Sequence, residues 1–270
     1  MSWSDVRAAL AETDPQAKCL RVDRLWGKVE SGVFVPVDPA RSSASEAVRS
    51  GVPSVGHPDR PVLVHPSKLP RRGLGSAEGR IALIHAVAHI EFNAINLGLD
   101  AALRFAGMPD AYYRDWLSVA WDEARHFRLL EDRLHQLGAA YGDFPAHNGL
   151  WDMAEKTAHD VLVRMALVPR VLEARGLDVT PGMIERLRAV DDRATVACLE
   201  TILDEEVRHV AVGSRWFRFC CEDRDVDPEP TFRQLLTDYF GGALRGPFNH
   251  PARREAGFSA PELEALEAMA

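Results

Sequence analysis

The chain has 270 residues and a mass of 29.9 kDa, enough for one large domain or two small ones around a substantial buried core. Hydrophobic residues make up 46% of the chain and charged residues 27%, which excludes a wholly disordered protein. The formal net charge of −8 argues against a general nucleic-acid binder, although a local basic patch is compatible with it.

Targeting and redox signals favour the cytoplasm. No apolar run approaches the roughly 18 residues of a membrane span, and the N-terminus carries Asp5 instead of the apolar stretch of a secretory signal. The four cysteines have neither CxxC nor disulfide-framework spacing, which predicts reduced thiols. We therefore expect a cytoplasmic protein without a membrane partner.

Residues 1–75 are predicted to form an N-terminal arm that wraps the rest of the protein. After a short helix over residues 5–12, proline and glycine accumulate beyond Pro15, so we expect mostly extended or turn-like chain. A few apolar residues would anchor this arm. A small basic cluster is interpreted as a solvated surface rather than a phosphate site: Lys68, Arg71 and Arg72.

From Ser76 onward the hydrophobic periodicity predicts an all-α fold with almost no strand signal. Ser76 is a good N-cap for the first long helix, and Asp191 or Asp192 for the last. Four long helices are expected over residues 78–105, 110–137, 150–175 and 192–220. We therefore predict a four-helix bundle over residues 76–221.

Two features interrupt or follow this bundle. The third helix is expected to break at Gly176, and a short helix should restart at Pro181, a residue suited to a first helical turn. Residues 222–270 are predicted to be a loop-rich C-terminal tail, which closes with a helix capped at Ser259.

Two of the predicted helices carry the same charged pattern. Residues 122–126 read DEARH and residues 205–209 read EEVRH, and each contains Glu-x-x-His. This spacing places a carboxylate and an imidazole one turn apart on one helical face. By itself the signal is weak, because such a chain holds roughly one match by chance. Both motifs, however, lie on otherwise apolar faces, where a charge is costly unless it is paired or bound to a metal.

The preceding helix of each pair supplies one further carboxylate, Glu91 and Glu173. Glu91 lies 32 residues before Glu123 with the predicted turn at the midpoint, so both stand roughly 24 Å from that turn at about 1.5 Å per residue. Glu173 lies 33 residues before Glu206 in a similar arrangement, on a less uniformly apolar face. Glu173 and Glu206 lie equally far from the second turn only if the chain continues in the same direction after the break at Gly176.

One Glu from each of two helices and a Glu-x-x-His from each of the other two make the ligand set of carboxylate-bridged di-iron or di-manganese bundles. The predicted metal ligands are Glu91, Glu123, His126, Glu173, Glu206 and His209. Carboxylates with imidazoles suit two iron ions, and leave Mn/Fe and di-manganese pairs open. Asp122 and Glu205 are expected to accept a hydrogen bond from the opposite motif's histidine. No catalytic residue is assigned beyond the metal centre.

Through these motifs the chain resembles the ferritin-like superfamily, most closely an uncharacterised ferritin-like family related to the di-iron tRNA hydroxylases. The resemblance covers most of residues 60–260. It rests on the segments HAVAHIE (85–91), EARHF (123–127), LEARG (172–176) and GPFN (246–249). It implies a ferritin-like fold and a dimetal site, and only loosely a reaction and a substrate.

Other charged residues near the motifs receive more ordinary interpretations. His85 and His89 form an i, i+4 pair that could clamp a metal, but we interpret them as packing residues or as groups behind the ligands. Arg125 and Arg208 are interpreted as internal ion-pair partners, and Arg170 is left unassigned.

The leading hypothesis is an O₂-activating oxidoreductase of hydroxylase or oxygenase type that takes electrons from an external donor. The alternatives are a ferroxidase or peroxide-scavenging protein, and a helical scaffold with a structural metal site. The long terminal extensions argue against a storage cage, and the missing CxxC pair argues against a rubredoxin-type centre. The substrate, a small molecule or an RNA, is left open, as is the oligomeric state, a homodimer included.

Overall fold

The computed structural model describes residues 3–41, 52–70, 72–241 and 244–269; Arg71 of the predicted basic cluster lies outside these ranges. The described residues are helical apart from turns, loops and one isolated bridge between Leu63 and Ala146. The all-α class is therefore confirmed for this part of the chain. Two compact units, Met1–Trp151 and Asp152–Ala270, make up the chain. The division into arm, bundle and tail stays a prediction.

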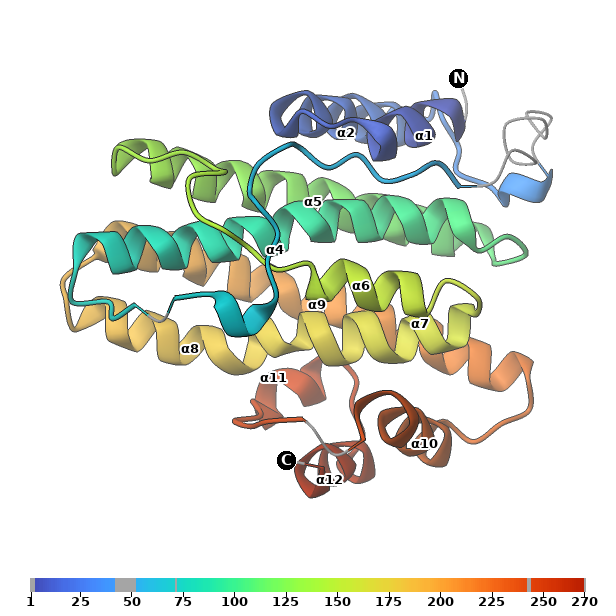
Figure 1. Cartoon of the computed structure of the whole chain (residues 1–270). Coiled ribbons are helices and arrows are strands. Elements are labelled where there is room, and N and C mark those ends of the chain that lie inside the picture. Colours follow the sequence, from blue (N-terminus) through green and yellow to red (C-terminus); the bar gives the residue numbers. More distant parts are fainter. Residues whose placement is uncertain (1–2, 42–51, 71, 242–243, 270) are drawn as a thin grey trace. The chain divides into compact units, whose positions relative to one another are not determined.

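The first unit contains an antiparallel pair of long helices, α4 (Ala77–Arg104) and α5 (Asp110–Gln136) (Figure 1). Ser76 caps α4 as predicted, because its side chain accepts a hydrogen bond from the N–H of Gly79 at 3.0 Å. The chain leaves α5 through Gly138, whose φ of 75° is a backbone conformation that glycine adopts without strain.

The expectation of an extended chain beyond Pro15 is wrong for residues 15–30, which form helix α2 (Pro15–Glu30). Asp14 is its N-cap and accepts a hydrogen bond from the N–H of Ala17 at 2.7 Å. Pro15 takes the first helical position, where the missing N–H has no helical partner to lose. Helix α2 packs on α5, and α1 (Trp3–Ala11) packs on α4. Two 3₁₀ turns precede α4: η1 (Pro39–Arg41) and η2 (Pro66–Lys68).

Helix α4 also has the length and apolar character of a membrane span, although the sequence shows no uninterrupted apolar run of that length. Within the structure, 67% of its most apolar window is buried. Ile95 and Leu99, for example, are completely inaccessible to solvent. This burial is typical of the core helix of a soluble protein.

The second unit contains α8 (Ala174–Arg188) and α9 (Arg193–Asp223), which pack against each other. Of the two predicted candidates it is Asp192 that caps α9, and its side chain accepts a hydrogen bond from the N–H of Thr195 at 3.2 Å. Two elements lead into α8 and also pack on α9, namely α7 (Val161–Leu167) and the π-helical turn η3 (Val168–Glu173). Helix α6 (Gly149–Lys156) precedes α7 in the chain.

The predicted third helix with its break at Gly176 is wrong in two respects. Helices α6 and α7 are separate, and α8 continues past both Gly176 and Pro181. A proline inside a helix leaves the carbonyl four residues earlier without its usual donor. Here that carbonyl belongs to Leu177, and the side-chain amide of Asn249 donates a hydrogen bond to it at 3.0 Å. A polar contact from the C-terminal tail thus satisfies the backbone at the proline.

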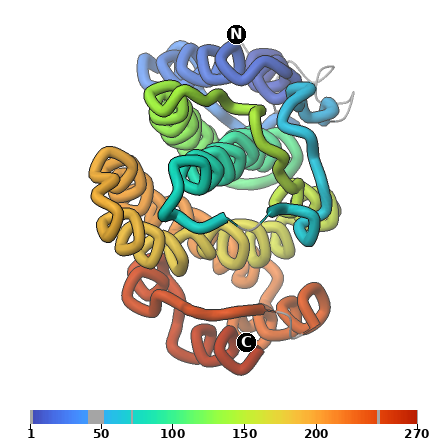
Figure 2. The backbone as a smooth tube through the Cα atoms, turned by 60° about the vertical axis from the view of Figure 1, so that its left-hand side comes forward, coloured from blue at the N-terminus to red at the C-terminus, as the bar shows by residue number. Residues whose placement is uncertain are grey.

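The tail contains two helices where loops were expected, α10 (Pro228–Phe240) and α11 (His250–Glu255), and closes with the predicted helix, α12 (Ala260–Ala268) (Figure 2). Asp227 caps α10 and Pro228 comes next at the first helical position, as Asp14 and Pro15 do in α2. The predicted Ser259 cap of α12 is confirmed.

Replacing two helical glycines, Gly98 and Gly176, by alanine should change the free energy of unfolding in opposite directions. A Cβ at Gly98 of α4 would lie 2.8 Å from the carbonyl oxygen of Trp116 and 2.9 Å from Cβ of Ala120, both on α5. A Cβ at Gly176 of α8 would meet no atom within 4 Å. We expect Gly98→Ala to lower the free energy of unfolding by about 1–3 kcal/mol. Gly176→Ala should raise it by up to about 1 kcal/mol.

Urea denaturation followed by circular dichroism measures both changes. A stabilised Gly98→Ala variant would mean that α4 and α5 do not approach as closely as the structure shows.

Candidate metal centre

Helices α4 and α5 bring three predicted ligands together in the first unit. Nδ1 of His126 lies 3.3 Å from Oε2 of Glu91 and 3.4 Å from Oε2 of Glu123. All three side chains are almost completely buried. The equal distances of Glu91 and Glu123 from the α4–α5 turn account for this meeting, because the two helices run antiparallel from that turn.

The charges of Glu91, Glu123 and His126 shift one another's pKa values. Burial, and next the negative charge of Glu123, raise the pKa of Glu91 to about 8. For His126, burial alone would lower the pKa, but its hydrogen bonds with Glu123 and Glu91 and their charges outweigh burial and raise it to about 11. Two buried carboxylates thus share one imidazole, and a metal cation would take the place of the protons that Glu91 and His126 hold.

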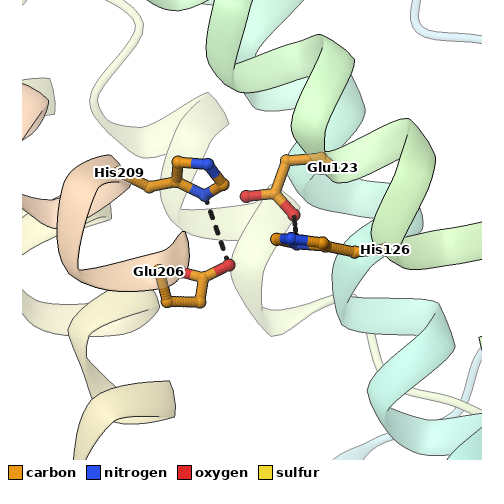
Figure 3. Close-up of side chains that lie close together, drawn as sticks. All are labelled: Glu123, His126, Glu206 and His209. Carbon is orange, nitrogen blue, oxygen red and sulfur yellow. Dashed lines mark hydrogen bonds and ion pairs between the residues drawn. The ribbon is translucent and has the colours of Figure 1, made fainter. Parts of the chain in front are cut away.

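The second Glu-x-x-His pair lies on α9 in the second unit. Glu206 and His209 are buried, and Nδ1 of His209 lies 3.3 Å from Oε1 of Glu206. Figure 3 shows this contact and the one between Glu123 and His126 as dashed lines, each between two side chains on the same helix. Each pair is therefore arranged as the i, i+3 spacing predicts.

Glu173 is the last residue of η3 and is buried. A π-helical turn contains more residues than an α-helical turn, so it changes the direction in which the following side chain points. The sequence pattern predicted a regular helix here, with a mixed face around Glu173. Pro169, the second residue of the turn, was the available sign of irregular helix at this place.

Four of the six predicted ligands form one buried group that could hold a metal ion. Each of Glu123, His126, Glu206 and His209 offers one ligand atom, and these atoms lie within 4.8 Å of one another (Figure 3). Two carboxylate oxygens with two imidazole nitrogens are a donor set that iron and manganese accept. The residues present therefore fit a metal of this kind.

The residues expected behind the ligands lie on α5 and α9. Asp122 is buried on α5, and its Oδ1 accepts a hydrogen bond from Nη1 of Arg125 at 2.7 Å. The ion pair expected of Arg125 is thus present, but the side chain of Arg125 is 37% exposed and not internal. On α9, Glu205 is partly buried, whereas Arg208 is exposed, so the internal position expected of Arg208 is wrong. The hydrogen bonds predicted from the histidines to Asp122 and Glu205 stay predictions.

His89 belongs to a network that the sequence did not indicate. Its Nδ1 lies 2.8 Å from the hydroxyl of Tyr141, and its Nε2 lies 3.1 Å from Nδ2 of Asn93. The ring of Tyr141 also makes an edge contact with that of Phe127, the residue after His126. Tyr141 lies in a loop, where hydrophobic periodicity gives no information about its partners. The network supports His89 as a packing residue.

Fold and site together define an all-helical protein with a buried Glu/His group that could hold a metal ion. Residues 11–264 match the model of the family described as "Protein of unknown function (DUF455)", and the chain belongs to this family. It is 42% identical to an uncharacterized protein of Haemophilus influenzae over an alignment that covers 97% of this chain and 92% of the relative. No solved structure matches the chain.

Proposed function

We propose that this protein is a dimetal oxidoreductase of the ferritin-like kind, with iron in its centre. The observation that carries the proposal is the buried group of Glu123, His126, Glu206 and His209, whose ligand atoms lie close enough together to share a metal. Charged and ionisable side chains enter an apolar core at a cost of several kcal/mol unless something compensates them. A pair of divalent cations would provide that compensation.

Glu91 and Glu173 complete the proposed ligand set. Glu91 lies 3.3 Å from His126, and Glu173 is buried at the end of η3, on the chain segment that packs along α9. With them, each of four helical segments contributes one carboxylate, and two also contribute an imidazole. This is the set that ferritin-like dimetal bundles use. The four-helix bundle itself is part of the proposal.

The reaction that we propose is hydroxylation of an organic substrate, R–H + O₂ + 2e⁻ + 2H⁺ → R–OH + H₂O, in which the bound metal pair would supply the redox chemistry. The two electrons would come from an external donor, since none of the four buried cysteines belongs to the Glu/His group. The predicted Glu and His ligands would hold the ions, and the burial of Glu91 and His126 would keep water away from them. The cytoplasm remains the proposed location.

Metal analysis of protein purified without chelator tests the proposal. We expect about two iron or manganese ions per chain, as in dimetal carboxylate sites, and a loss of at least one in each of the Glu123→Ala and Glu206→Ala variants. The iron-loaded, oxidised protein should absorb in the near ultraviolet through ligand-to-metal charge transfer.

Glu131 provides a matched control, because it is also a buried glutamate on α5 but lies outside the group. Glu131→Ala should keep the metal content of the unmodified protein. Full metal retention in Glu123→Ala and Glu206→Ala would refute the ligand assignment, whereas two bound ions without O₂ consumption in the presence of reductant would favour a structural metal site.

A further inference from the structure

Arg170, left unassigned from the sequence, lies in η3 and is completely buried. Its guanidinium carbon lies 4.3–4.6 Å from the centroids of three aromatic rings, which belong to Phe217, Phe232 and Phe258. Nη2 forms an ion pair with Oε1 of Glu262 at 2.7 Å. Both side chains of this pair are at most 2% exposed, so no water screens it.

The partners of Arg170 connect η3 with the C-terminal tail. Phe232 lies in α10, Phe258 directly precedes the cap of α12, and Glu262 lies in the first turn of α12. The backbone carbonyl of Arg170 also accepts a hydrogen bond from Nη1 of Arg253 in α11 at 3.2 Å. Each of α10, α11 and α12 thus contributes a residue that contacts Arg170.

The turn that Arg170 occupies needs such support. A π-helical turn is less favourable than an α-helical one, and Pro169 removes one of its backbone donors. The turn is also closely packed, because a Cβ at Gly213 of α9 would lie 2.4 Å from Cγ of Pro169. Glu173 comes three residues after Arg170, at the end of this turn. Any relaxation of η3 towards a regular α-helix would rotate Glu173 away from its present direction.

We propose that Arg170 and Glu262 are positioning residues, through which the C-terminal tail fixes η3 and directs the carboxylate of Glu173 into the metal centre. This inference rests on the proposed function. The C-terminal tail would thus contribute to metal binding although it holds none of the predicted metal ligands. Loss of the Arg170–Glu262 pair is expected to weaken metal binding through Glu173, in addition to any effect on stability.

Two variants of α12 separate positioning from stability. The capping box of α12 uses both Ser259 and Glu262: Ser259 Oγ accepts from the N–H of Glu262, and Glu262 Oε2 accepts from the N–H of Ser259. Glu262→Gln keeps an acceptor for the cap but removes the charge that pairs with Arg170. Ser259→Ala weakens the cap and leaves the ion pair in place.

Ferrous ion, titrated without oxygen in competition with a chromogenic chelator, measures the affinity, and urea denaturation measures the stability. We expect Glu262→Gln to weaken the binding of at least one iron tenfold or more, and Ser259→Ala to keep the affinity of the unmodified protein while losing stability. The proposal would be overturned if Glu262→Gln and Ser259→Ala bound ferrous ion with equal affinity. It would also be overturned if the iron affinity of each variant fell in proportion to its loss of stability.

A double-mutant cycle tests whether Glu262 acts through Glu173. In a Glu173→Ala background, Glu262→Gln should cause no further loss of iron affinity, although its effect on stability should persist. An additive loss of affinity would refute the positioning role. An unmodified protein that binds no iron would instead refute the proposed function, so the two failures are distinguishable.

Discussion

Replacing Asp178 by alanine is expected to lower the stability of the second unit by about 3–5 kcal/mol, the cost of breaking a buried ion pair. Asp178 in α8 accepts two hydrogen bonds from Arg253, at 2.9 Å to Oδ1 and 2.7 Å to Oδ2. Its Oδ1 also accepts the backbone N–H of Asn249 at 2.8 Å. The variant leaves the guanidinium of Arg253, which is 1% exposed, buried without its counter-charge.

An exposed pair in the same unit provides the control. Arg188 and Glu200 form an ion pair whose side chains are 59% and 47% exposed. Glu200→Ala should cost at most about 1 kcal/mol, since water screens such pairs. Urea denaturation at neutral pH compares the two variants. Similar losses would mean that Asp178 and Arg253 are not buried in solution.

A second outcome identifies the cause of the loss. The double variant Asp178→Leu, Arg253→Met removes both charges and keeps apolar volume in the core, so it should be more stable than Asp178→Ala alone. If it is less stable, the geometry of the hydrogen bonds, including the one to Asn249, contributes more than the unpaired charge does.

Local rules predicted the ends of several helices correctly and failed at others for one recurring reason. Ser76, Asp192 and Ser259 were recognised because a polar side chain stands just before a periodic segment. Helices α2 and α10 were missed because each begins with a proline, a residue that by itself indicates extended chain or loop. Proline at a first helical position and proline in a loop differ only in whether the next residues continue a helix.

The candidate site was predictable where helices are regular. The repeated Glu-x-x-His and the equal distances from a turn indicated that Glu91, Glu123 and His126 would meet, and the structure brings these three side chains together. Glu173 could not be placed in the same way, because equal spacing from a turn assumes 3.6 residues per turn and Glu173 ends a π-helical turn. The turn also contacts α12 through the ion pair of Arg170 with Glu262, a tertiary contact that no local pattern encodes.

Lys18 should make the stability of the first unit depend on pH above neutrality. It is completely buried in α2, and its Nζ donates hydrogen bonds to the carbonyl of Leu10 at 2.9 Å and to Oδ1 of Asn96 at 2.6 Å. Burial lowers the pKa of Lys18 to about 7, because the negative charge of Glu12 offsets the effect of burial only in part. In the unfolded chain the pKa returns to about 10.4.

Whether stability rises or falls with pH depends on whether the folded or the unfolded protein holds the Lys18 proton. Between pH 7 and pH 10 the unfolded chain keeps the Lys18 proton that the folded protein has released, so stability rises with pH by up to about 1 kcal/mol per pH unit from this group. Below the folded pKa both states are protonated and the contribution is constant. Lys18→Met removes this titration. From pH 7 to pH 9, the free energy of unfolding of the unmodified protein should therefore rise relative to that of Lys18→Met.

Urea denaturation at pH 7, 8 and 9 measures this difference, in which the titration of other groups largely cancels. Lys28→Met is the control, because Lys28 also lies in α2 but its side chain is 31% exposed and pairs with Asp5 at the surface. Its stability should follow the pH profile of the unmodified protein. Parallel profiles for Lys18→Met and the unmodified protein would show that Lys18 stays charged when folded, and that its hydrogen bonds and the ring of Phe92, 5.4 Å from Nζ, compensate the burial of the ammonium group.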